Sequence, residues 1–124
     1  MARVLVLDEQ NAGVGLRALL GARGHSVEIS EKLNVLESLA QHAPPDLLFV
    51  EPYLARRDAQ ALERIRAIMS STMQRGHVVV CTDIFTRNEL SETYGLQEGA
   101  HYHEYFIKPV DPADMLEQIQ FKTD

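Results

Sequence analysis

The stretch Pro45-Asp46-Leu47-Leu48-Phe49-Val50-Glu51 decides how this chain folds. Its four central residues are all apolar, and the proline before them cannot continue a helix. An apolar run without polar alternation is typical of a parallel strand that is buried on both faces. The run ends in a single carboxylate, Glu51. We therefore expect residues 47–50 to form a central strand that brings Glu51 to the carboxyl edge of a sheet.

Comparable apolar runs recur at 3–7, 78–81 and 105–107, and segments with helical spacing separate them. This alternation indicates an α/β fold with a parallel sheet. Residues 25–30 instead alternate between polar and apolar, which suits an edge strand with one wet face. We predict one domain over residues 1–124, with a flavodoxin-like, doubly wound sheet of five parallel strands in the order 2-1-3-4-5 and five helices. Residues 3–7 and 47–50 should be almost fully buried.

Helical signals fill the intervals between the strands. Three apolar stripes at helical spacing are formed by Leu16, Leu19 and Leu20, by Val35, Leu36 and Leu39, and by Leu62, Ile65, Ile68 and Met69. Thr86 with Glu89 predicts a capping box for a fourth helix, which Gly99 can end in a left-handed turn. Asp111-Pro112 opens a fifth helix, because proline is favoured at the first helical position.

Composition narrows the classes of function. The net charge of −6 argues against a nucleic-acid surface, because phosphate binding needs clustered Lys and Arg. The basic groups Arg56-Arg57 and Arg64 with Arg66 are more simply solvated helix faces. A single cysteine, Cys81, excludes a disulfide framework and suits a reducing cytoplasm. No stretch has the length of a membrane span or the pattern of a signal peptide. We therefore expect a cytoplasmic protein with neither nucleic-acid nor membrane partners.

Polar side chains follow the predicted strands where each strand ends. Asp8 and Glu9 follow the first strand, Glu51 the third, Thr82 the fourth and Lys108 the fifth. Because ligands bind outside the carboxyl ends of parallel strands, these side chains should converge on one site. Three carboxylates at one site repel one another, so either a divalent cation or Lys108 must neutralise them.

In order and spacing these residues resemble the receiver domain of two-component response regulators, and the resemblance runs over nearly the whole chain. It implies that Asp8, Glu9 and Glu51 form a Mg²⁺ site that supports phosphoryl transfer. It assigns Thr82 to the hydroxyl that bonds a phosphoryl oxygen and Lys108 to its counter-ion.

The same resemblance implies a cis bond between Lys108 and Pro109, and it matches Tyr105 to the aromatic that changes rotamer when receivers activate. It also implies partners: a histidine kinase or another signalling protein, and a second copy bound through the face of the fourth helix, fifth strand and fifth helix. All of these expectations are what the resemblance implies.

Departures from the family pattern concern the chemistry of the site. Position 51 holds glutamate where the family has the aspartate that is phosphorylated. The extra methylene adds about 1.5 Å of reach, which places the Glu51 carboxylate about where a phosphoryl group would form. We expect a fixed mimic of the phosphorylated state that is not an enzyme and binds Mg²⁺ weakly. Asp83 and Tyr53 should crowd the entrance, and the segment 101–104 is about two residues longer than the family pattern.

Two other functions stay open. A small phosphatase or phosphotransferase with a carboxylate nucleophile shares the fold class, but Glu9 and Gln10 follow Asp8 without the second aspartate that such enzymes need. A flavodoxin-like domain that binds FMN or cobalamin would need a Ser/Thr-rich phosphate loop or an Asp-x-His-x-x-Gly motif. His101 and His103 could pair on a metal, although a surface loop explains their spacing more simply.

Overall fold

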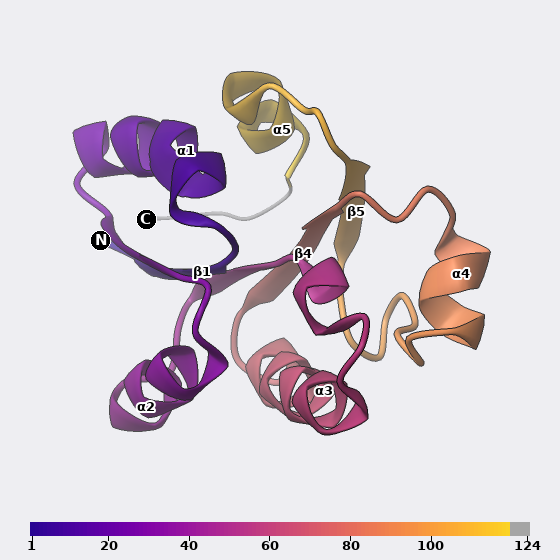
Figure 1. Cartoon of the computed structure of the whole chain (residues 1–124). Helices are drawn as coiled ribbons and strands as arrows, with labels where there is room; N and C mark the ends of the chain where they lie inside the picture. The colour runs from indigo at the N-terminus through magenta and orange to yellow at the C-terminus, as the bar shows by residue number, and fades with distance from the viewer. Residues whose placement is uncertain (120–124) are drawn as a thin grey trace.

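The computed structural model describes residues 1–119, which form a five-stranded parallel sheet with helices on both faces (Figure 1). The strands are β1 (Arg3–Leu7), β2 (Ser26–Ser30), β3 (Leu47–Val50), β4 (His77–Thr82) and β5 (Glu104–Ile107). Their order is β2-β1-β3-β4-β5, so the predicted topology is confirmed. Both β2 and β5 are edge strands.

The helices are α1 (Gln10–Ala22), α2 (Leu33–His42), α3 (Ala59–Met73), α4 (Arg87–Glu92) and α5 (Pro112–Gln118), with a short 3₁₀ helix, η1 (Pro52–Ala55), after β3. Figure 1 shows α1 and α5 on one face of the sheet and α2 and α3 on the other. No helix within residues 1–119 has the length and apolar character that crossing a membrane requires.

Each central strand supplies both hydrophobic cores, because successive side chains point to opposite faces. On β1, Val4 and Val6 belong to the core beneath α1 and α5, whereas Leu5 and Leu7 belong to the core on the α2 and α3 side. The predicted burial is confirmed for 4–7 and 47–50. Arg3 is the exception, since it is only half-buried and its Nε donates to the Ala43 carbonyl oxygen at 2.9 Å.

The predicted helix ends were partly correct. The Thr86 hydroxyl accepts a hydrogen bond from the Glu89 N–H at 3.0 Å, so Thr86 caps α4 as expected. However, α4 ends at Glu92, well before Gly99. The chain turns first at Gly95, whose φ of 66° only glycine adopts readily, and Gly99 turns the following loop towards β5. Asp111 caps α5 through the Ala113 N–H at 2.8 Å, as predicted.

Candidate functional site

The register of β1 and β3 sets two carboxylates side by side. Leu7 pairs with Val50 at the last position of the ladder, so Asp8 and Glu51 leave neighbouring strands at the same edge. The Glu51 N–H donates to the Leu7 carbonyl at 2.9 Å, which extends the pairing by one residue. Asp8 is 6% exposed and Glu51 is 2% exposed. Two buried acidic groups on neighbouring strands need compensation by a positive charge.

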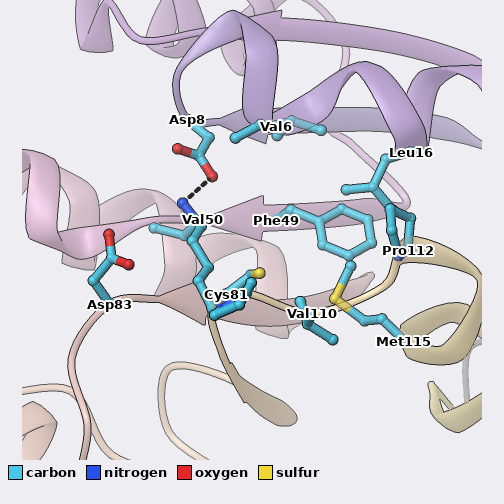
Figure 2. Close-up of a pocket in the computed structure, with 13 residues that line it drawn as sticks. Val6, Asp8, Leu16, Phe49, Val50, Cys81, Asp83, Val110, Pro112 and Met115 are labelled. Carbon is cyan, nitrogen blue, oxygen red and sulfur yellow. Dashed lines mark hydrogen bonds and ion pairs between the residues drawn. The ribbon is translucent and has the colours of Figure 1, made fainter.

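Lys108, which directly follows the edge strand β5, provides that charge. Its Nζ lies 2.7 Å from Asp8 Oδ2 and 3.4 Å from Glu51 Oε1. The ion pair with Asp8 is drawn in Figure 2. The Lys108–Pro109 bond is cis, as the family resemblance implies. Sequence reasoning left a cation and Lys108 as alternatives for neutralising the carboxylates, and in the structure Lys108 contacts both of them.

Burial and ion pairing act in opposite directions on Lys108. Burial by itself lowers the pKa of an ammonium group. The hydrogen bond to Asp8 and the charges of Glu51 and Asp8 outweigh burial, so the pKa of Lys108 is raised above its usual value. The lysine is therefore a permanent positive charge at neutral pH.

The Glu51 carboxylate is bonded at both oxygens. Oε1 accepts from the Asp83 N–H at 3.1 Å, and Oε2 accepts from the Tyr53 N–H at 3.1 Å, which also caps η1. Burial raises the pKa of Glu51 above its usual value, although the hydroxyl of Thr82, these backbone donors and Lys108 all act to lower it. Hydrogen-bond donors therefore surround the Glu51 carboxylate, but its burial still makes the charged form less favourable than it is in water.

The three acidic side chains that the resemblance assigns to Mg²⁺ do not converge in the structure. Glu9 is exposed, and its N–H occupies Asp8 Oδ1 at 2.8 Å while Lys108 occupies Oδ2. Within residues 1–119, no group of three or more His, Cys, Asp or Glu side chains is arranged to hold a metal ion. The expected cluster of Asp8, Glu9 and Glu51 is therefore not formed, because the lysine and backbone donors already bind the carboxylate oxygens.

Thr82 and Tyr105 lie on the β4 and β5 sides of the site. Thr82 is fully buried, and its Oγ1 accepts from the Ile84 N–H at 3.1 Å. The Tyr105 hydroxyl donates to the Ile84 carbonyl oxygen, and the ring of Tyr105 packs against the core on the α3 side. The Arg87 guanidinium carbon lies 5.3 Å from the centroid of that ring. Both residues therefore hold the beginning of the loop between β4 and α4.

Sequence reasoning missed two of the groups that bind Glu51. Asp83 and Tyr53 were expected to obstruct the entrance with their side chains, which are both exposed. Their contribution at the site is a backbone N–H, and a backbone donor leaves no signal in residue identity. His101 and His103 do not form a metal pair, since each Nδ1 accepts a backbone N–H, from Gln97 and Val78 respectively, both at 3.0 Å.

No family profile matches the sequence, and no curated protein matches it. Several solved structures, however, match this chain in fold. A response regulator from Thermotoga maritima is 19% identical, with a TM-score of 0.71 over 93% of this chain and 91% of that chain. A two-component response regulator from Clostridium difficile is 18% identical, with a TM-score of 0.74 over 94% and 91%. A chemotaxis protein of Vibrio cholerae is 20% identical, with a TM-score of 0.73 over 97% of both chains. The chain thus has the CheY-like receiver fold that the sequence resemblance indicated.

Proposed function

We propose that this chain is a receiver-type signalling module of a two-component phosphorelay, in which Glu51 permanently takes the place of a phosphorylated aspartate. One observation carries the proposal: the Glu51 carboxylate is 2% exposed and accepts backbone N–H bonds from Asp83 and Tyr53 beside the Lys108 ammonium. Donors of this kind are the groups that bind an anion at the edge of a parallel sheet.

The chemistry of glutamate supports a partial mimic. One carboxylate brings a single negative charge, whereas a phosphate brings nearly two and has three free oxygens. A fixed group shifts a two-state equilibrium only by its differential interaction with the two states. Two hydrogen bonds connect the site to the loop before α4: Thr82 accepts from the Ile84 N–H, and Tyr105 donates to the Ile84 carbonyl. A change at Glu51 can reach this loop through them. We propose that Glu51 favours this arrangement without phosphorylation.

The same contacts weigh against an enzyme that uses Glu51 as a nucleophile. Attack on a phosphoryl donor needs an exposed carboxylate oxygen with a free lone pair aimed at phosphorus, and errors near 1 Å can cost about 10²-fold in rate. Glu51 is almost fully buried, and both of its oxygens accept hydrogen bonds. A phosphatase or phosphotransferase function is therefore less well supported than a binding function.

Output would pass through contact with other proteins, a histidine kinase or another signalling partner. We propose the face of α4, β5 and α5 for this contact and for a homodimer. In its favour, β5 is an edge strand, and Ile107 at its end is 38% exposed. Phe85, in the loop that Thr82 and Tyr105 hold, is 73% exposed. An Ile107→Asp variant compared with wild type by light scattering tests the dimer, which the substitution should dissociate.

The decisive experiment is intact mass after incubation with acetyl phosphate and Mg²⁺, on wild type, Glu51→Asp and Glu51→Gln. We expect no phosphoryl adduct on wild type or on Glu51→Gln, and we use Glu51→Asp to show whether the site can support the transfer at all. Tyr105 ring signals by NMR provide the second measurement: they should shift in Glu51→Gln, which removes the charge. Efficient phosphorylation of wild type at Glu51 would contradict the proposal.

A further inference from the structure

A cavity of about 330 Å³ lies between the sheet and the helices α1 and α5. Figure 2 shows its apolar end, where Phe49 faces Met115 and Pro112. Cys81 and Val6 continue the apolar lining from the neighbouring strands. A volume of this size lies at the lower end of the range of small-molecule pockets, which are mostly apolar with a few polar groups. The proposed signalling function involves Asp8 and Lys108 at the polar end of the cavity, but not its apolar part.

The cavity is kept open by how α1 is held. A Cβ added at Gly13 would lie 2.6 Å from Ile29 Cδ1, and one added at Gly15 would lie 2.7 Å from Pro112 Cγ. The helix is therefore already in close contact with β2 on one side and with α5 on the other. Between these contacts, α1 lines the cavity with Leu16 and with the short side chain of Ala12. These close contacts set the distance between α1, the sheet and α5 beside the cavity.

The polar end of the cavity is acidic. Asp8, Asp83 and Lys108 line it, and Figure 2 shows the carboxylates of Asp8 and Asp83 at the end away from Phe49 and Met115. The Lys108 charge is shared between Asp8 and Glu51. Asp83 is exposed, and among residues 1–119 its carboxylate makes no ion pair or hydrogen bond, although its N–H donates to Glu51. One uncompensated carboxylate therefore stands at the entrance of an apolar cavity.

We propose that this cavity binds a small organic cation, with an apolar body against Phe49 and Met115 and an ammonium group at Asp83. An apolar body gains from leaving water, and the charge at the entrance selects a cation over an anion of the same shape. Asp8 and Lys108 belong both to this cavity and to the Glu51 site. A ligand in the cavity should therefore change the environment of Glu51. The binding itself does not depend on the proposed signalling function.

Three probes of one shape test the charge selection: phenylbutylamine, phenylbutanol and phenylbutanoate, which are cationic, neutral and anionic at neutral pH. Each is titrated into the wild-type protein, and methyl signals of Met115 and Val110 are followed by NMR. For ligands of this size we expect a dissociation constant on the order of 1 mM or below for the amine. The amine should bind about fivefold more tightly than the alcohol, which should in turn exceed the carboxylate.

Matched variants of α1 locate the site. Ala12→Leu fills the entrance, whereas Ala18→Leu makes the same change at another exposed position of the helix, away from the cavity. We expect Ala12→Leu to weaken the amine about tenfold or more and Ala18→Leu to leave it unchanged. Asp83→Asn should remove the preference of the amine over the alcohol and leave the affinity of the alcohol as it was. Equal binding of the amine and the carboxylate, equal effects of the two leucine variants, or no saturable binding of the amine would each overturn the proposal.

Discussion

Thr82 and Tyr105 are joined through the backbone of a single residue. The Thr82 hydroxyl accepts the Ile84 N–H, and the Tyr105 hydroxyl donates to the Ile84 carbonyl. Ile84 is itself 2% exposed, so the loop after β4 is anchored by its apolar side chain and by both of its peptide groups. The Thr82 hydroxyl also lowers the pKa of Glu51, which ties this loop to the charge of the site.

Tyr105→Phe removes the hydroxyl donor to Ile84 and keeps the ring. A hydrogen bond of this kind contributes about 1 kcal/mol, so we expect amide hydrogen exchange of residues 84–86 to accelerate about fivefold. Tyr53→Phe serves as the control, because Tyr53 is 39% exposed and its hydroxyl takes no part in this link. Unchanged exchange in Tyr105→Phe would show that the loop does not depend on the hydroxyl.

Lys108→Met leaves Asp8 and Glu51 buried without their shared counter-ion. Removing one partner of a buried ion pair costs about 3–5 kcal/mol, and we expect a loss of that order in the free energy of unfolding measured by urea denaturation. In a Glu51→Gln background the same change should cost less, because one of the two charges is already absent. Additive effects of the two substitutions would mean that Lys108 and Glu51 do not interact.

The raised pKa of Glu51 predicts how stability varies with pH. Its folded-state pKa lies above the ordinary value of 4.5, so the folded state binds this proton more tightly than the unfolded state does. The stabilisation from protonation is complete below pH 4.5 and is lost as the pH rises through the folded-state pKa. The stability of wild type relative to Glu51→Gln should therefore fall with rising pH in that window. A rise over the same window would reverse the sign of the shift.

Cys81 should be an unreactive thiol. Burial raises its pKa from 9.0 to about 11, and the nearby Lys108 only partly opposes this. At pH 8 the thiolate fraction would be about a hundredfold below that of an ordinary cysteine, since only the thiolate reacts. We expect alkylation by iodoacetamide to be slower by about that factor in the folded protein than in urea. Comparable rates in the two states would contradict the burial of this side chain.

Mg²⁺ should bind the wild type more weakly than micromolar affinity, because Lys108 and backbone donors occupy the carboxylate oxygens. Lys108→Ala should strengthen Mg²⁺ binding by freeing Asp8 Oδ2. Calorimetric titration of both proteins measures the difference. Micromolar affinity in the wild type would show that the lysine gives way to the metal.

The sheet could be predicted because its central strands are apolar at nearly every position, a pattern that parallel strands buried on both faces share. The same topology brings Asp8, Glu51 and Lys108 together without any knowledge of side-chain geometry. Sequence could not show which oxygen each donor would occupy. The backbone N–H groups of Asp83 and Tyr53 bond both oxygens of Glu51, and neither donor could be read from residue identity.

Local turns were also less predictable than strands. The left-handed turn that follows α4 lies at Gly95, and a Cβ there would come within 2.4 Å of the Arg66 guanidinium. The sequence predicted that Gly99 would end the helix, because the close approach of Arg66 in α3 to Gly95 cannot be read from the sequence. Any glycine can adopt the left-handed conformation, so contacts between distant segments decide which one ends the helix.

Glu51 is a side chain specified by the gene, and this gives the proposed module a different time course from one that is phosphorylated. A phosphoaspartate has a lifetime, so a receiver that depends on it reports recent events and then resets. The Glu51 carboxylate, by contrast, is present from synthesis and is not removed by hydrolysis. Under the proposed function, the strength of the signal therefore depends on the number of copies of the protein in the cell. The signal rises with synthesis of the protein and falls with its degradation.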